Sequence, residues 1–381
     1  MKYYDVAIIG GGASGLACAA ILVKNKKVKT VLIDAGERLG KKLAATGNGQ
    51  GNLSNEDMTA EHYHGGNIRL AENIACSGLA AYKKLFDCMF VSDGAGRVYP
   101  AGRQASALCD ILISQIGNVD VIKSKAVSLK SGFEIKLENG ETIKSKRVVL
   151  SVGGKSQKQF KTDGSSYRLA TDLGHTLTPL YPSLVQLKTD TTYIKTLKGI
   201  RAECEVSANV VAKKVRGDVI FTDYGVSGSA IFSMSPYVSD KQNAHISLSF
   251  LPDFDEKTIY DVLSVRLKSG VNINDLLCGT LHNQIGRAII KRANSDDLNK
   301  IIAVIKNFTL PVLGTLGFDY AQVTKGGINM NEVTDSLESK IEKNLFFAGE
   351  VLDVDGDCGG YNLQWAFASG ITVAETILKS I

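Results

Sequence analysis

The order of apolar and polar positions at the start of the chain predicts a strand, a helix and a second strand. Residues 4–9 form a short apolar run typical of a buried strand, and glycines and small residues follow at 10–15. Residues 16–23 then have the apolar spacing of a helix, and 30–33 form a second apolar run that ends at Asp34. This order of elements is typical of a βαβ unit.

The later segments predict two more strands, a long helix and a large insertion. Strands are expected at 148–154, ending in a glycine pair, and at 345–350, ending in a glycine and an acid, and a helix is expected at 361–378. Between them, 183–250 alternates in the manner of short strands, whereas 255–308 carries apolar residues at helical spacing, which core packing explains. The pattern therefore predicts an α/β fold with a β-rich and a helical insertion.

Composition narrows the class of protein only a little. The chain has 381 residues, 44% hydrophobic and 22% charged, with a formal net charge of +5. That length favours two or three domains, and the mildly basic balance is compatible with an anionic cofactor but says little about nucleic acid.

Cysteine usage and hydropathy bear on the compartment. Seven scattered cysteines without a C-x-x-C pair argue against a zinc knuckle or a redox dithiol and fit a reducing cytosol. Asp5 and the glycines that follow interrupt any signal peptide, and no stretch reaches transmembrane length. We therefore expect a cytoplasmic protein that does not bind a membrane.

A glycine motif lies at the first strand–helix junction. Residues 10–15 read G-x-G-x-x-G, and an acid follows the first glycine by 24 residues at the end of the second strand. The first glycine permits a tight turn, the second lets backbone approach a pyrophosphate, and the third lets the helix pack on the strand. The alternative is a glycine turn without a ligand, which the strand, helix and acid in register disfavour. The expected dinucleotide ligands are Gly10, Gly12, Ala13, Ser14, Gly15 and Asp34.

A second loop, at 40–55, is rich in glycine and amide side chains and follows the second strand. Such a loop donates N–H groups to phosphate and flavin oxygens. Its expected cofactor ligands are Lys42, Thr46, Gly47, Asn48 and Asn52, and Gly153 and Gly154 extend the set after a third strand.

Further motifs occur in a fixed order: GRVYP at 96–100, LKGIR at 197–201, FTDYGVSG at 221–228, TKGG at 324–327 and GGYNLQWA at 359–366. With them the chain resembles, over nearly its whole length, the BaiN/RdsA-type flavoproteins, also described as the YhiN-like or aminoacetone-oxidase family. The resemblance implies FAD as cofactor and a two-dinucleotide-type, Rossmann-like FAD-binding domain with inserted domains. The implied segments are FAD-binding at 1–182, β-barrel-like at 183–252, helical at 253–318 and FAD-binding again at 319–381.

The chain departs from this family at a few positions. Gln50 and Gly51 stand where relatives often carry Arg-Cys, Asp223 stands where His is common, and Ser229 stands where Pro is usual.

The C-terminal motifs supply further expected cofactor ligands. A helix that begins near Gly360 points N–H groups at the flavin edge where negative charge builds on reduction. Glu350, after Gly349, is expected to bind the ribitol, with a capping or surface carboxylate as the alternative. The remaining expected ligands at the helix start are Tyr361, Asn362 and Leu363.

Several polar residues near these motifs have ordinary explanations. The acidic run at 353–357 lacks the other ligands of a calcium loop, so we expect no metal. Cys358 is expected to be a small buried filler rather than a redox thiol, because no second cysteine lies near it in sequence. His62 and His64 are expected to be polar loop residues, with a role as an acid as the alternative.

The expected substrate side consists of Arg97, Tyr99, Thr222, Asp223 and Tyr224. A tyrosine can donate a proton while flavin N5 delivers hydride, and an arginine can hold a carbonyl or carboxylate. For each of these residues, packing and interdomain hydrogen bonds are the alternative.

The favoured reaction is an NAD(P)H-linked reduction of a conjugated C=C beside a carbonyl, in a 3-oxo bile acid or steroid-type enone or in uridine of ribosomal RNA. No second G-x-G-x-x-G follows a strand, so NAD(P)H is expected to bind transiently. The alternatives are an amine oxidase that acts on aminoacetone-like amines with O2, and a non-catalytic flavin-bearing RNA-binding factor. Basic residues interspersed with acids at 188–218 leave an RNA partner open, and the oligomeric state also remains open.

Overall fold

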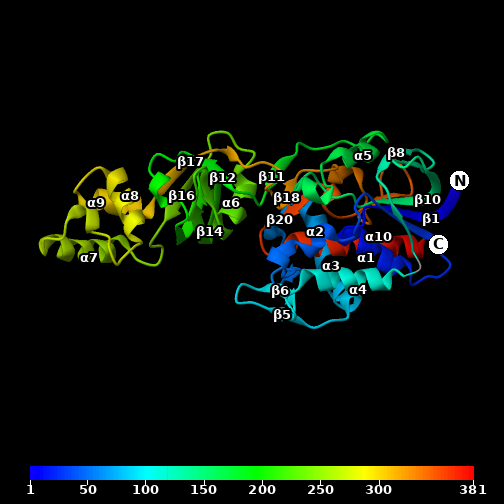
Figure 1. The fold of residues 1–381 in the computed structure, drawn as a ribbon, viewed down its shortest axis with the longest axis horizontal. Helices are drawn as coiled ribbons and strands as arrows, with labels where there is room; N and C mark the ends of the chain where they lie inside the picture. The colour runs from blue at the N-terminus through cyan, green and yellow to red at the C-terminus, as the bar shows by residue number, and fades with distance from the viewer. Residues whose placement is uncertain (118) are drawn as a thin grey trace. The chain divides into compact units, whose positions relative to one another are not determined.

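The computed structural model describes residues 1–117 and 119–381, which divide into two compact units (Figure 1). Unit 1 comprises Met1–Tyr181 and Val323–Ile381, and unit 2 comprises Pro182–Gln322. Each unit has its own apolar core. In the described ranges, no helix is long and apolar enough to cross a membrane.

A parallel sheet forms the centre of unit 1. Strand β1 (Lys2–Ile9) pairs in parallel with β2 (Thr30–Asp34) on one side and with β10 (Thr142–Leu150) on the other. β7 (Asp120–Lys123) extends the sheet beyond β2, and β19 (Leu345–Phe347) pairs in parallel with β10. The C-terminal part of the chain thus completes a sheet that the N-terminal part begins.

Helices cover this sheet, and an antiparallel extension lengthens it. Helix α1 (Ala13–Leu22) packs against α10 (Tyr361–Lys379), which in turn packs against α3 (Ile68–Phe86), as Figure 1 shows. α1 is apolar around nearly its whole circumference, as a helix buried on all sides must be. β8 (Ala126–Lys130) and β9 (Glu134–Leu137) form an antiparallel meander with the first half of β10.

Two small sheets and short helices complete unit 1. The antiparallel order β3–β6–β5 forms one small sheet, and β4 pairs with β20 in the other. Their bounds and those of the remaining elements are β3 Ser54–Asn55, β4 Tyr63–Gly65, β5 Phe90–Ser92, β6 Arg97–Pro100, β18 Val323–Lys325, β20 Val354–Gly356, α2 Lys41–Ala44, α4 Ala105–Gln115 and α5 Arg168–Thr171; β11 spans Tyr181–Ser183.

Unit 2 is a closed six-stranded barrel with helices. The strand order is β12–β15–β14–β13–β16–β17, and the inward side chains alternate along each strand, as Cys204 and Val206 do on β13. The strands are β12 Leu187–Thr189, β13 Arg201–Ala208, β14 Val211–Phe221, β15 Gly225–Ser227, β16 His245–Ser249 and β17 Phe308–Thr315, and the helices are α6 Ser229–Val238, α7 Glu256–Lys268, α8 Asn283–Ala293 and α9 Leu298–Lys306.

The predicted α/β class with an inserted barrel is confirmed, but two elements differ from the expected pattern. Helix α6 lies inside the 183–250 segment that we expected to consist of strands; its buried Ala230, Met234 and Val238 are spaced four apart, which fits both a helix and a strand pattern. Strand β17, which pairs with both β12 and β16, lies in the 253–318 range expected to be helical. The strand that closes the barrel therefore follows the helices α7, α8 and α9 in the sequence.

A buried histidine joins two segments of unit 1. His175 Nδ1 lies 3.2 Å from Glu332 Oε2, and Nε2 lies 2.9 Å from Ser339 Oγ, which also accepts the N–H groups of Ile341 and Glu342. Because a carboxylate only accepts, Nδ1 carries the proton and Nε2 accepts from the serine hydroxyl. Burial lowers the pKa of His175, against the opposing effect of Glu332.

This neutral histidine predicts a pH-dependent stability. Since the folded state resists protonation of His175, the unfolded state binds more protons below about pH 6.5, and stability is lost as the pH falls through that value. We expect His175→Gln to destabilise unit 1 by about 1–3 kcal/mol at neutral pH and to flatten this dependence. Urea unfolding followed by fluorescence of Trp365, the single tryptophan, measures both. His245→Gln, at a half-exposed barrel position, is the control; equal pH slopes for wild type and His175→Gln would contradict the assignment.

Candidate functional site

The G-x-G-x-x-G turn has the close backbone contacts that its glycines were expected to allow. Gly10 has φ +109°, and a Cβ there would lie 2.2 Å from Ser151 O. A Cβ on Gly15 would lie 1.9 Å from Gly10 O, so α1 can pack on β1 only through a glycine. A Cβ on Gly12, by contrast, would meet nothing within 4 Å, so this face of the turn is open to a ligand.

The N-terminus of α1 is prepared for an anion. Gly12 is the N-cap, no side chain caps the helix, and its first turn holds no acid. The N–H groups of the first turn and the helix dipole therefore favour a phosphate there. Ser14 uses its hydroxyl to donate to Ala348 O, at 3.2 Å, so it offers a ligand its backbone. Asp34 accepts the N–H groups of Gly11 at 2.6 Å and Gly36 at 2.7 Å, which fixes the carboxylate beside the turn.

The glycine- and amide-rich loop forms a series of left-handed turns. Gly47 has φ +57° and Asn48 φ +54°, and Thr46 donates its hydroxyl to Leu43 O at 2.7 Å. The Asn52 amide, in the orientation that satisfies both of its groups, donates to Ser54 O and accepts the N–H of Gly360, each at 3.2 Å. The loop is therefore tied to the start of α10.

Lys42 and Glu350 lie together in a polar cluster. Lys42 Nζ donates to Glu350 Oε2 and to Ser156 Oγ, both at 2.8 Å, and Glu350 Oε1 accepts from Ser156 Oγ at 3.0 Å and from the N–H of Thr324 at 2.9 Å. With only 19% of its side chain exposed, Glu350 is not the surface carboxylate that we considered. Gly154 borders the cluster, because a Cβ there would lie 2.5 Å from Thr324 Oγ1.

Gly153 and Leu363 are two further predicted cofactor residues of unit 1. Gly153 follows β10 with φ +73°, and Leu363, in the first turn of α10, is half-buried against the core of unit 1.

The start of α10 is a second helix N-terminus without a side-chain cap. Gly360, its N-cap, has φ +103°, and a Cβ there would lie 2.2 Å from Ser54 O. Asn55 Nδ2 donates to Gly359 O at 3.0 Å. Asn362, expected to contact flavin, instead uses its amide to accept from the N–H of Gly356 at 2.9 Å and to donate to its carbonyl at 2.7 Å.

A cluster of histidines and acids, not foreseen from the sequence, holds this helix start. Asp357 contacts His62 Nδ1 at 3.1 Å and His64 Nε2 at 3.0 Å, and His62 Nε2 lies 3.1 Å from Asp57 Oδ2. The His62 ring stacks on Tyr361 with centroids 4.4 Å apart. The pairing of β4 with β20 brings these residues together. The cluster could not be predicted because these two strands lie far apart in the sequence.

Arg97 and Tyr99 lie on β6, whose partner β3 borders the start of α10. Arg97 Nε donates to Asp93 Oδ2 at 2.8 Å, and no hydrogen bond to a described residue engages its terminal nitrogens. Tyr99 is only 7% exposed, and its hydroxyl makes no hydrogen bond within the described ranges. The Arg103 guanidinium lies 4.5 Å from its ring centroid. Burial raises the pKa of the Tyr99 phenol, and the charges of Arg97 and Arg103 oppose that rise.

Cys358 lies close enough to Arg97 and Tyr99 to interact with both electrostatically. Burial raises the pKa of its thiol, and Arg97 opposes that rise. A neutral, mostly buried thiol agrees with the expected filler.

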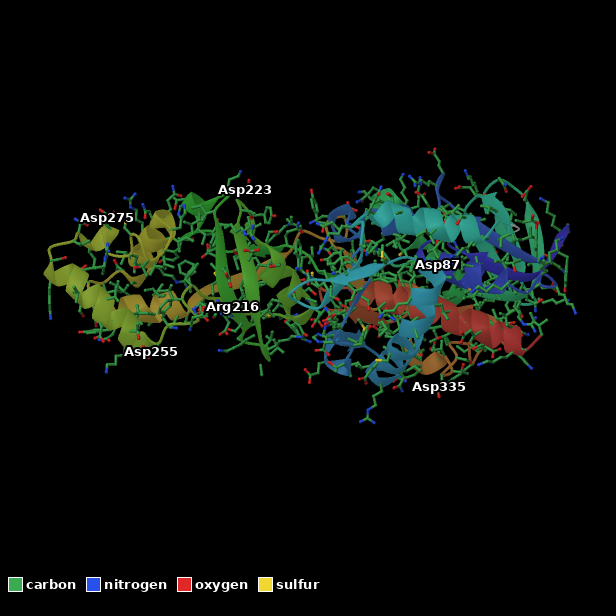
Figure 2. All side chains as sticks on the ribbon, turned by 90° about the horizontal axis from the view of Figure 1, so that it is seen from below. Asp87, Arg216, Asp223, Asp255, Asp275 and Asp335 are labelled. Carbon is green, nitrogen blue, oxygen red and sulfur yellow. The ribbon has the colours of Figure 1, made fainter. Side chains whose placement is uncertain are left out.

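The other three predicted substrate residues lie in unit 2, at the turn between β14 and β15. Asp223, which is labelled in Figure 2, is exposed and pairs with Lys198 Nζ at 2.8 Å, which lowers the pKa of its carboxyl. Thr222 accepts no hydrogen bond at its buried Oγ1 from any described residue, and its N–H donates to Gly225 O at 2.9 Å. Tyr224 is half-buried and accepts the N–H of Thr189 at its carbonyl.

The basic run on the barrel is balanced by acids. Arg216, which is labelled in Figure 2, makes two 2.6 Å contacts with Asp253 and one of 2.9 Å with Glu203. Arg201 pairs with Asp218, and Lys214 pairs with Glu205. Four cations of this run are therefore paired with acids, whereas the exposed Lys188 and Lys195 make no ion pair with a described residue.

The residues of unit 1 fit FAD. Two uncapped helix N-termini, the open space at Gly12 and the polar cluster of Lys42 and Glu350 supply donors for phosphates and polar partners for a sugar alcohol.

Comparisons with known proteins agree with this fit. A family described as HI0933-like protein Rossmann domain matches residues 4–376. A 3-dehydro-bile acid delta(4,6)-reductase of Clostridium scindens is 32% identical over 96% of this chain and 97% of its own. A ribosomal RNA dihydrouridine synthase of Escherichia coli is 26% identical over 100% of this chain and 99% of its own.

Solved structures show the same fold. The crystal structure of 3-ketosteroid-delta4-(5alpha)-dehydrogenase from Rhodococcus jostii RHA1, in complex with 4-androstene-3,17-dione, has a TM-score of 0.52 at 16% identity and covers 98% of this chain and 97% of its own. The predictions of a Rossmann-type FAD-binding fold and of an FAD-dependent oxidoreductase are confirmed. The chain belongs to the HI0933-like family.

Proposed function

We propose that this protein reduces a carbon–carbon double bond conjugated to a carbonyl in a small molecule, with FAD as cofactor and NAD(P)H as reductant. FAD, when bound, supplies hydride to the alkene carbon remote from the carbonyl. The 3-dehydro-bile acid reductase among the relatives supports this class of reaction. Enones of 3-oxo bile acids and steroids, and acidic enones of smaller size, are the substrates to test first.

The observation that carries the proposal is the state of Tyr99. Its side chain is only 7% exposed, and its hydroxyl has no partner among the described residues. That hydroxyl is not one of the fully buried unpaired groups, so a substrate can reach it and take the hydrogen bond. Because burial raises its pKa, the phenol keeps its proton at neutral pH and can give it to the alkene carbon beside the carbonyl. Arg97, with unused terminal nitrogens, can stabilise the negative charge that develops on the carbonyl oxygen.

The chain's own residues would hold the cofactor in four places. The first turn of α1, open at Gly12, would bind the pyrophosphate, and Asp34 would face a ribose. The Lys42–Glu350 pair would lie beside the ribitol, and the N-terminus of α10 would favour negative charge at the flavin. NAD(P)H would bind transiently, because the G-x-G-x-x-G motif that follows a strand is assigned to FAD and no second one follows a strand.

Charge pairing favours a small molecule over ribosomal RNA. Nucleic-acid affinity depends on cations that are free to neutralise phosphates, whereas the barrel cations at Lys198, Arg201, Lys214 and Arg216 face acids. The E. coli relative named as a dihydrouridine synthase keeps uridine in RNA as the second candidate. An amine oxidase would instead be reduced by aminoacetone and restored rapidly by O2.

Gly12→Val tests the cofactor site. A valine side chain there meets no protein atom within contact distance at its Cβ, so the fold should persist while the pyrophosphate position is filled. We expect purified Gly12→Val to retain less than about a tenth of the wild-type flavin absorbance. Gly94→Ala, another open glycine of unit 1, is the matched control and should stay yellow. Full flavin retention by Gly12→Val with a normal circular dichroism spectrum would contradict the assigned site.

Tyr99→Phe tests the proton donor through separate half-reactions. Reduction of the flavin by NAD(P)H under anaerobic conditions should be unchanged, whereas its reoxidation by an enone should slow by about 10²–10⁴-fold. Tyr3→Phe, at a 53% exposed tyrosine of the same unit, should behave as wild type in both. If no enone reoxidises the wild-type protein but uridine-containing RNA does, or aminoacetone reduces it with peroxide formed, the proposed reaction is wrong.

A further inference from the structure

Arg103 lies over the predicted proton donor in a fixed position. After β6 the chain turns so that the Arg103 N–H donates to Pro100 O at 2.8 Å, and Arg103 itself adopts a left-handed φ of +45°. A left-handed backbone conformation costs energy for a residue such as arginine, so the surrounding turn, closed by the hydrogen bond to Pro100 O, must maintain it. The turn carries the guanidinium back over Tyr99, 4.5 Å from the ring centroid.

A second contact orients the guanidinium. Gln50, from the glycine-rich loop, accepts a hydrogen bond from one terminal nitrogen of Arg103 at 3.2 Å. Gly51 allows that loop to lie against α4, because a Cβ there would already be 3.1 Å from Ala105 Cα. The guanidinium thus contacts the Tyr99 ring with one face and Gln50 with one N–H group. Its remaining N–H groups are used by neither of these two contacts.

The charge around Tyr99 is unbalanced. Arg97 and Arg103 are the cations that act on the phenol, and Asp93 is the carboxylate, so two positive charges face one negative charge. Asp93 is committed to Arg97, at 2.8 Å. Among the residues that the structure describes, no carboxylate lies within ion-pair distance of Arg103. Elsewhere in unit 1, Arg38 and Arg168 pair with an acid, whereas Arg69 and Arg147 make no ion pair with a described residue.

We propose that Arg103, oriented by Gln50 and by the Tyr99 ring, binds a carboxylate on the substrate, so that the enzyme selects enones that carry a carboxylate close to the conjugated carbonyl. This inference rests on the proposed enone reduction at Tyr99. Arg97 then serves the carbonyl oxygen and Arg103 the carboxylate, which aligns the double bond between them. A guanidinium and a carboxylate can form two parallel hydrogen bonds, which supplies the orientation as well as the charge.

The experiment compares matched acidic and neutral ligands on the FAD-loaded protein. The probes are 4-oxo-2-pentenoic acid and its methyl ester as substrates, and 4-oxopentanoic acid, which lacks the double bond, as a binding ligand measured by calorimetry. We expect the free acid to be preferred over the ester in kcat/KM. We expect Arg103→Gln to weaken binding of 4-oxopentanoate by about tenfold and to lower kcat/KM for the acid by about tenfold more than for the ester. Gln50→Ala should cause a smaller loss of the same kind.

Arg38→Ala is the control, because it removes an exposed arginine of the same unit that is already paired. Equal kcat/KM for acid and ester in the wild type, or equal losses for acid and ester in Arg103→Gln, would overturn the proposal. Binding of 4-oxopentanoate that depends on Arg103, in a protein that reduces no enone, would support the carboxylate site and remove the proposed reaction. Neutral steroid enones reduced with a kcat/KM equal to or above that of the acidic enone, together with no loss for the acid in Arg103→Gln, would leave the reaction standing and overturn this inference.

Discussion

The close packing of backbone around Ser14 is the constraint on which the rest of unit 1 depends. Gly15 brings α1 against Gly10 at the end of β1. A Cβ on Gly349 would lie 2.6 Å from Ser14 Oγ, and a Cβ on Gly370 would lie 2.2 Å from Ser14 O. The two chain ends therefore meet on one residue of α1, where side chains larger than hydrogen have no room. This contact sets the positions of α1 and α10, and hence of the two helix N-termini that fit FAD.

Around this frame, polar groups are satisfied by one another in ways that hold loops for a ligand. Glu350 joins three parts of the chain, through Lys42 in α2, Ser156 after β10 and Thr324 in β18. Asp357 joins two histidines to the start of α10. Removing one partner of such a cluster leaves another polar group buried without compensation, which costs more than the hydrogen bond itself contributes. These clusters give the loops of the site a single arrangement before any cofactor is bound.

The sequence predicted those parts of the molecule that depend on neighbouring residues. The strands around Ile8, Leu32 and Val149 are short apolar runs, and the glycine turn needs residues at fixed offsets, so both could be identified from the chain alone. Helix α6 was missed because apolar residues spaced by four also satisfy a period of two. Strand β17 was missed because barrel closure is decided by β12 and β16, which lie far away in the sequence.

The site was predictable to the same extent and for the same reason. Motifs placed the glycines, Lys42 and Glu350, but the Asp357–His62 contact requires β4 to pair with β20, and no local pattern encodes that pairing. Arg103 lies outside every motif, and only the turn after β6 brings it over Tyr99.

The environment of Tyr99 shows how one buried phenol can serve both chemistry and selection. Burial alone makes a tyrosine a poor acid, because the phenolate that forms is costly in a medium of low polarity. The guanidinium groups of Arg97 and Arg103 lower that cost because they lie close to the phenol. Only one carboxylate, Asp93, opposes their two positive charges, so the site also attracts an anionic ligand. A substrate carboxylate at Arg103 would neutralise the excess charge, while Arg97 stays with Asp93 and the reacting carbonyl. The same electrostatic arrangement that keeps Tyr99 usable as a proton donor therefore discriminates between charged and neutral enones.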